Sequence, residues 1–145
     1  MSVEKRIRVL FACAGNTCRS LMAEFIARER FGHLIEPSSA GFNPGSRTDA
    51  ENAINTLKKL LKIDASTHTP RRITQVDLDG ADLVVTMDGW VARQFRQEFP
   101  EHPPAQLVRW RIPDPFGDDL EEYERCASRL FKGIKRLIAD RGLTR

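Results

Sequence analysis

The segment from Cys13 to Ser20 joins a cysteine to an arginine at a spacing that suits chemistry on a phosphate group. It reads Cys-Ala-Gly-Asn-Thr-Cys-Arg-Ser, so that five residues separate Cys13 from Arg19. The guanidinium of an arginine can donate two parallel hydrogen bonds to phosphate oxygens. A cysteine inside such a positively charged site is expected to lose its proton easily and to act as a nucleophile. The segment therefore predicts attack of the Cys13 thiolate on a phosphorus atom.

The pattern on either side of this segment supports that interpretation. A buried strand is predicted over residues 8–12 and a helix over residues 19–31, so the segment is the loop between them. In this position several backbone N–H groups and the positive end of the helix can face one anion, and Gly15 permits the tight backbone path. The residues predicted to bind the phosphate are Ala14, Gly15, Asn16, Thr17, Cys18 and Ser20.

The same residues also have simpler interpretations. A buried cysteine at the end of a strand is often only a small apolar side chain, and its spacing from an arginine is a weak signal by itself. The combination of a preceding strand, Gly15, Asn16 and a following helix is what favours a phosphate site. The segment has no Gly-Lys-Ser/Thr ending, which excludes a Walker-type nucleotide-binding loop.

Short apolar runs alternate with longer amphipathic segments along the whole chain. This alternation predicts an α/β fold, a single domain over residues 1–145 with a four-stranded parallel sheet and helices on both faces. Ligands of such sheets bind outside the carboxyl ends of the strands, which is where the phosphate-binding loop after the first strand lies. The predicted strands cover residues 8–12, 35–40, 83–87 and 107–108, and the predicted helices cover residues 19–31, 49–61 with a cap at Thr48, 75–80 with a cap at Thr74, 90–99 and 120–138.

The composition fits a globular protein that works in the cytoplasm. Hydrophobic residues make up 41% and charged residues 30% of the 145 residues. No apolar run approaches the roughly 20 residues of a membrane span, and the run Val9–Ala14 is too short for a secretory signal. We therefore expect no membrane partner. The net charge of +3 is spread along the chain, which gives no support for a nucleic-acid partner; the oligomeric state is left open.

Several segments, in the same order, resemble the low-molecular-weight protein tyrosine phosphatases. The stretch from Val9 to Glu24 resembles the signature of that family, and further matches span nearly the whole chain. These are Ser39-Ala-Gly41, His68 followed by Arg71-Arg-Ile-Thr74, Ala81-Asp-Leu-Val-Val-Thr-Met-Asp88, and Asp114-Pro-Phe-Gly117. The resemblance implies an enzyme that removes phosphotyrosine-type phosphomonoesters from a phosphorylated protein. It also implies a cysteinyl-phosphate intermediate and a reaction that needs no metal and no other cofactor.

The resemblance also implies roles for residues outside the loop. Asp114 is expected to be the general acid, because the acid of this family is the aspartate of an Asp-Pro pair near the C-terminus. Asn16, Ser39 and His68 match positions that hold the phosphate loop by hydrogen bonds, although each also fits an ordinary place in a turn, at a strand end or on the surface. Asp88 matches an aspartate close to the site, without a defined role.

Two residues of the loop and one aromatic residue bear on the substrate and the thiolate. Ser20 is expected to stabilise the Cys13 thiolate, to cap the following helix, or to do both. Tyrosine-specific family members usually have Ile or Leu where this chain has Thr17, whereas members that resemble protein-arginine phosphatases have Thr. Phosphoarginine is therefore an alternative substrate. Phe116 stands where many members have Tyr and can still form an aromatic wall.

Arsenate reductases of the same fold provide a third alternative. They pass oxidation on to further cysteines, which lie as a pair just beyond the third strand, but residues 87–104 contain no cysteine here. The odd number of cysteines, Cys13, Cys18 and Cys126, argues against a disulfide framework. For Cys18 two interpretations stand: it captures oxidised Cys13 as a disulfide, or it packs under the loop.

Overall fold

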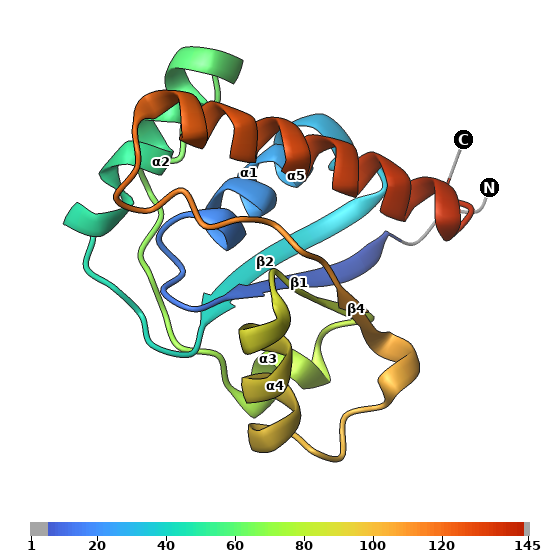
Figure 1. Cartoon of the computed structure of the whole chain (residues 1–145). Coiled ribbons are helices and arrows are strands. Elements are labelled where there is room, and N and C mark those ends of the chain that lie inside the picture. Colours follow the sequence, from blue (N-terminus) through green and yellow to red (C-terminus); the bar gives the residue numbers. More distant parts are fainter. Residues whose placement is uncertain (1–5, 144–145) are drawn as a thin grey trace.

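Four parallel strands form one sheet in the order β2-β1-β3-β4 (Figure 1). The computed structural model describes residues 6–143. β1 pairs with β2 over its full length and with β3 on its other side, and β4 pairs with β3. The predicted four-stranded parallel sheet is thus confirmed. The strands are β1 (Ile7–Cys13), β2 (Ile35–Gly41), β3 (Leu83–Thr86) and β4 (Leu107–Arg109).

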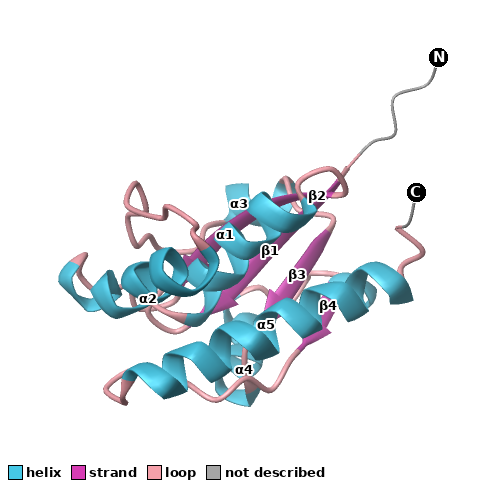
Figure 2. Ribbon diagram, turned by 90° about the horizontal axis from the view of Figure 1, so that it is seen from above, coloured by secondary structure: helices cyan, strands magenta, loops and turns pink. Residues whose placement is uncertain are grey.

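Helices cover both faces of the sheet, as predicted (Figure 2). α1, α2 and α5 pack on one face, and α3 and α4 pack on the other. The α-helices are α1 (Arg19–Phe31), α2 (Glu51–Thr56), α3 (Gln75–Asp79), α4 (Gly89–Glu98) and α5 (Leu120–Asp140), and the shorter turns are η1 (Thr48–Ala50), η2 (Leu57–Leu61) and η3 (Pro104–Gln106).

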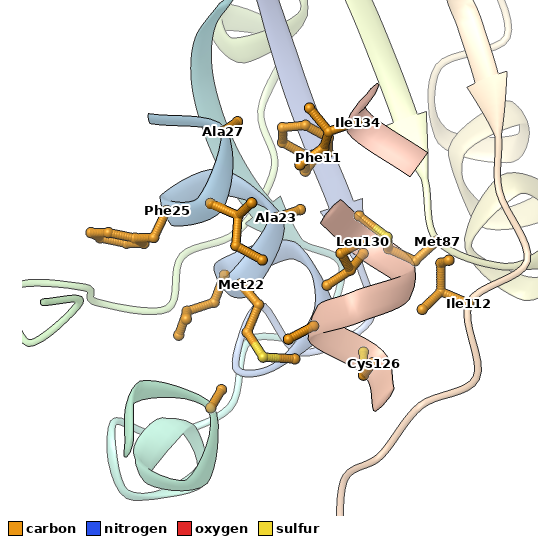
Figure 3. Packing of buried hydrophobic residues seen from close by; sticks show 14 of the residues in the cluster. Phe11, Met22, Ala23, Phe25, Ala27, Met87, Ile112, Cys126, Leu130 and Ile134 are labelled. Atoms are coloured by element: carbon orange, nitrogen blue, oxygen red, sulfur yellow. The ribbon is translucent and has the colours of Figure 1, made fainter. Parts of the chain in front are cut away.

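Alternation along β1 explains why both faces are covered. Successive side chains of a strand point to opposite faces of the sheet. Val9 and Phe11 belong to the apolar cluster that includes α1 and α5, whereas Leu10 and Ala12 belong to the cluster that includes α3 and α4. Figure 3 shows the first cluster, in which Phe11 lies among side chains of α1 and α5. Burial on both faces is the reason that β1 is a continuous apolar run in the sequence.

The segment predicted as one helix over residues 49–61 has three parts. It begins as the 3₁₀ turn η1, continues as α2 and ends as the π turn η2, after which Lys62 adopts a left-handed conformation with φ of 58°. The predicted cap at Thr48 is wrong, because Thr48 lies inside η1 and its side chain caps nothing. Ser46 and Asp49 close this turn instead: the Ser46 N–H donates to Asp49 Oδ2 at 2.9 Å, and the Asp49 N–H donates to Ser46 Oγ at 3.2 Å.

The other predicted elements agree with the structure to within a residue or two at their ends. α1 has the predicted bounds. Thr74 caps α3 through reciprocal hydrogen bonds with Asp77, which confirms that prediction. α5 starts at Leu120 as predicted and continues to Asp140.

β1 lies where the chain reverses its direction across the sheet. α1 leads from β1 to β2 on one side, whereas β3 lies on the other side of β1. Ligands of open α/β sheets bind at the carboxyl ends of the strands beside such a point. Cys13 is the last residue of β1, so the fold brings the predicted nucleophile to that position. Among the described residues, no helix combines the length and the apolar character needed to cross a bilayer.

Candidate active site

Two hydrogen-bonding groups surround the sulfur of Cys13. The Sγ atom lies 2.8 Å from the hydroxyl of Ser20 and accepts the backbone N–H of Asn16 at 3.2 Å. Both groups can donate to a thiolate, so the arrangement suits a sulfur that reacts as a nucleophile. The side chain is almost fully buried, yet it borders a pocket at the carboxyl end of β1.

Ser20 serves the sulfur and not the helix end. Its Oγ contacts Cys13 Sγ and accepts the side-chain amide of Asn16 at 2.8 Å. The prediction that Ser20 caps the helix is therefore wrong. Cys18, which precedes the first residue of α1, forms no side-chain cap either. The first-turn N–H groups of α1 are thus left without a capping side chain, which is the usual arrangement at an anion site.

Asn16 fixes the shape of the loop. It is fully buried and has a left-handed backbone with φ of 55°, a conformation that asparagine tolerates better than most residues. Its amide nitrogen donates to Ser20 Oγ and, at 3.0 Å, to Ser39 Oγ, and its Oδ1 accepts the Arg71 N–H at 3.0 Å. His68 Nε2 lies 2.8 Å from the backbone oxygen of Asn16. The structure thus brings Asn16, Ser39 and His68 together around the loop.

Gly41, the last residue of β2, packs closely against the loop. A Cβ atom on Gly41 would lie 2.6 Å from the carbonyl oxygen of Ala14 and 2.9 Å from the nitrogen of Asn16. On Gly15, by contrast, the nearest atom to a Cβ would be Thr17 Oγ1 at 3.1 Å. Gly41 therefore lets β2 pack directly against the loop.

Acceptors on one side hold the guanidinium of Arg19 in place. Nη1 donates to Asp88 Oδ2 at 2.8 Å and to the carbonyl oxygen of Ile112 at 2.9 Å, while Nη2 lies 3.8 Å from Asp114 Oδ2. The buried Nε has no hydrogen-bond partner among the described residues. Burial would lower the pKa of Arg19, but the hydrogen bond to Asp88 and nearby negative groups raise it above its ordinary value. The Nε–Nη2 edge is thus a charged donor pair that suits an oxyanion.

Asp88 orients Arg19. Its Oδ2 accepts from Arg19, and its Oδ1 accepts the N–H of Val91 at 2.8 Å, which caps α4. Burial would raise the pKa of Asp88, but these hydrogen bonds lower it below its ordinary value. An ionised carboxylate held on both oxygens is a positioning group and a poor proton donor. The role of Asp88 was undefined from the sequence, and these contacts suit it to positioning Arg19.

Asp114 comes from the loop between β4 and α5. Its Oδ1 accepts the N–H of Phe116 at 3.0 Å, a turn that fixes the carboxylate beside the pocket. About half of the side chain (49%) is exposed, so water can reach it. Cys13, Arg19 and Asp114 therefore border one pocket, although Asp114 lies far from the other two residues in the sequence.

The pocket has a volume of about 250 Å³ and combines polar and aromatic walls. Trp90 and Phe116 are both substantially exposed, at 44% and 53%, and give it an apolar rim. Asn16 and Ser20 are fully buried and do not line it. In residues 6–143, no group of three or more His, Cys, Asp or Glu side chains is placed to hold a metal ion. The lining residues are Cys13, Ala14, Gly15, Thr17, Cys18, Arg19, Asn43, Gly45, Asp49, Trp90, Asp114 and Phe116.

Comparison with known families agrees with this geometry. The model of the low molecular weight phosphotyrosine protein phosphatases matches residues 8–143. The chain belongs to this family. The match includes the loop after β1, Asp114 and all of the sheet except Ile7 at the start of β1, so the resemblance noted in separate segments extends over the fold.

Individual relatives of the phosphatase have several activities. The low molecular weight protein tyrosine phosphatase from T. tengcongensis is 35% identical, with a TM-score of 0.83 over 92% of this chain and 99% of that chain. The YwlE arginine phosphatase from Geobacillus stearothermophilus is 28% identical, with a TM-score of 0.82 over 92% of both chains. An arsenate reductase from Bacillus cereus strain 03BB102 is 32% identical over 136 residues, 92% of this chain and 96% of its own. Family membership therefore leaves the substrate undecided.

Two side chains at the site of the phosphatase were not singled out by the sequence. Glu24 accepts the Ser39 hydroxyl at 2.5 Å on one oxygen and Arg28 at 2.7 Å on the other, and so ends the hydrogen-bond chain from Ser39. Its spacing of four residues from Arg28 was the available signal. Trp90 lies in the first turn of α4, four residues after the end of β3, and an exposed tryptophan just beyond a strand's carboxyl end could have indicated a binding surface.

Cys18 packs against α5 in this phosphatase. Its side chain is buried beside Cys126, which is itself fully buried. Its proximity to Cys126, together with burial, raises the pKa of Cys18 above its ordinary value. The buried position of Cys18 in the same apolar cluster as Cys126 favours packing under the loop.

The stability of the phosphatase is expected to fall when the pH drops below about 6.5, the ordinary histidine value. Burial lowers the pKa of His68 in the folded protein. The unfolded chain therefore takes up a proton first as the pH falls, and linkage makes folding less favourable from there down to the folded pKa. Urea unfolding at pH 7.5 and pH 5.5 measures the change.

Replacing His68 identifies its share of this pH dependence. His68→Gln should be less stable than the unaltered protein at pH 7.5 and should lose less stability on acidification. His102, whose pKa burial also lowers, will leave a residual dependence. His33→Gln, at an exposed position, is the control. An identical pH slope in His68→Gln and the unaltered protein would contradict the prediction.

Proposed function

We propose that this chain is a protein phosphatase that works through a cysteinyl-phosphate intermediate on Cys13. The observation that carries the proposal is the position of Arg19. Its Nη1 is fixed by Asp88 and Ile112, and its buried Nε, beside the Cys13 pocket, has no hydrogen-bond partner within residues 6–143. A buried, charged, unpaired donor is costly unless a ligand satisfies it. Phosphate oxygens in the pocket that Cys13 and Arg19 share would provide that partner.

The reaction takes place in two displacement steps. In the first, the Cys13 thiolate forms a bond to phosphorus, the bond to the leaving group breaks, and Asp114 gives the leaving atom a proton. In the second, Asp114 accepts a proton from water, the water oxygen bonds to phosphorus, and the S–P bond breaks to return the thiolate. Arg19 and the loop N–H groups stabilise the charge on the phosphoryl oxygens in both steps. Ser20 donates to the thiolate when it is free.

Phosphotyrosine is the first substrate candidate. Trp90 and Phe116 border the pocket with large exposed aromatic surfaces, which suit stacking against a phenyl ring. Purified protein should therefore release phosphate from a phosphotyrosine peptide without added metal. Arsenate with a thiol reductant is the comparison assay, because 32%-identical relatives are arsenate reductases. Reduction of arsenate without peptide dephosphorylation would replace the proposal, although residues 87–104 lack the cysteines that such enzymes use.

Phosphoarginine is the second candidate, and Thr17 is the residue that favours it. Thr17 is 6% exposed and lines the pocket next to Cys13, where a hydroxyl can accept from a guanidinium and a branched alkyl group cannot. Thr17→Ile should shift the ratio of kcat/KM values away from a phosphoarginine peptide and toward a phosphotyrosine peptide. The matched variant Thr17→Ser retains the hydroxyl and should retain the ratio. If Thr17→Ile leaves the ratio unchanged, Thr17 does not discriminate.

A further inference from the structure

The wall of the pocket carries a carboxylate that the proposed reaction does not use. Asp49 borders the pocket together with Cys13, Thr17 and Asp114. We propose that Asp49 is a specificity-determining residue, which favours a cationic N-phosphorylated side chain, phosphoarginine, over phosphotyrosine. The inference rests on the proposed phosphatase function and names the substrate class of the same site.

Backbone hydrogen bonds tie the segment before Asp49 to the phosphate loop. In residues 43–45, the N–H groups of Asn43 and Gly45 donate to carbonyl oxygens of the loop at 2.8 and 2.9 Å. The turn that follows is closed by Asp49 itself, whose Oδ2 accepts the N–H of Ser46 at 2.9 Å. The carboxylate is thereby held at a set distance from the loop, as a specificity element requires.

Asp49 and Thr17 are neighbours in the wall. A Cβ atom on Gly45 would lie 2.8 Å from Asp49 Oδ2 and 2.9 Å from Thr17 Cγ2. Both side chains therefore pack against the same glycine, Asp49 through its carboxylate and Thr17 through its methyl group, whereas the Thr17 hydroxyl is the atom nearest to a Cβ on Gly15, at 3.1 Å. Both residues line the pocket and carry acceptor oxygens, which can bind a planar group with several N–H donors, such as a guanidinium.

The balance of charge around the pocket also favours a cation. The charged side chains that line it are Arg19, Asp49 and Asp114, and Arg19 already contacts Asp88 and Asp114. With the phosphoryl group held by Arg19 and Asp114 carrying the proton for the leaving atom, Asp49 is the carboxylate that faces the rest of the substrate. A phenol brings no positive charge to offset this carboxylate. A guanidinium does, and its attraction to a partly exposed carboxylate can discriminate between the two substrates.

The variant Asp49→Asn tests the inference, because asparagine can still accept the Ser46 N–H but carries no charge. Its kcat/KM for a phosphoarginine peptide should fall about threefold to tenfold, the range for a partly exposed charge contact. Its kcat/KM for a phosphotyrosine peptide of the same sequence should stay unchanged or rise. Glu51→Gln removes an exposed carboxylate two residues away that does not line the pocket, and it should leave the ratio unchanged.

The possible outcomes separate this inference from the proposed function. A shift of the ratio in Asp49→Asn but not in Glu51→Gln supports it. Equal losses on both peptides would show that Asp49 only holds the loop, and would overturn it. An unaltered protein that hydrolyses phosphotyrosine but not phosphoarginine would overturn the inference and leave the phosphatase function in place. An unaltered protein that hydrolyses neither peptide would overturn both.

Discussion

Cys13→Ser is expected to abolish turnover on every phosphorylated substrate while it leaves phosphate binding in place. A serine hydroxyl is a far weaker nucleophile than a thiolate, and Ser20 and Asn16 are arranged to donate to a charged sulfur. Arg19 and the loop are untouched by the change, so inorganic phosphate should still bind. Steady-state kinetics with a phosphotyrosine peptide and calorimetric titration of phosphate together measure the two effects.

Cys126, a buried cysteine in α5, provides the control for Cys13. Cys126→Ala removes a fully buried thiol that does not line the pocket, so it should lower stability more than kcat. Near-normal turnover by Cys13→Ser would refute the cysteinyl-phosphate scheme. Loss of phosphate binding in the same variant would indicate that the loop had collapsed, and Cys13→Ala with the same titration would then test the nucleophile.

Asp114→Asn is expected to slow hydrolysis of poor leaving groups by about 10² to 10⁴, the usual contribution of a general acid. The amide can still accept the Phe116 N–H, so the turn that holds residue 114 should persist. An activated nitrophenyl ester has a leaving group that hardly needs a proton, and its hydrolysis should lose much less. The ratio of the two kcat values therefore reports the proton transfer directly.

A neighbouring carboxylate provides the matched control for this prediction. Asp118→Asn makes the same chemical change in the same loop at an exposed residue that does not line the pocket, and it should leave both rates unchanged. Equal losses on the poor and the activated substrate in Asp114→Asn would remove Asp114 from the acid role. The two rates of Asp88→Asn should differ from those of both Asp114→Asn and Asp118→Asn, because Asp88 acts by orienting Arg19.

The sequence determined the elements of this protein and the identity of its loop. Those features depend on local patterns: the apolar run of β1, the helical spacing of α1 and the Cys13-to-Arg19 segment between them are all visible within one stretch of chain. The alternation of such stretches was sufficient to predict the parallel sheet and its carboxyl-end site. The predicted helix caps at Thr48 and Ser20 were wrong, because a polar side chain near a helix start has several possible hydrogen-bond partners.

Local sequence patterns did not predict which distant side chains reach the loop. Ser39, His68, Asp88 and Asp114 were expected there only from the family resemblance, and the tertiary structure decided what Asp88 contacts. Asp88 contacts Arg19 although the two residues are 69 positions apart in the sequence, and a local sequence pattern does not predict a contact at that separation. The same holds for Asp49, which reaches the pocket because the segment after β2 hydrogen-bonds to the phosphate loop. The order of the strands in the sheet determines these contacts. The ends of β1, β2 and β3 lie side by side, so the segments that follow these strands converge on Cys13. Local periodicity fixes each element, whereas only packing the elements together brings the carboxylates to the site.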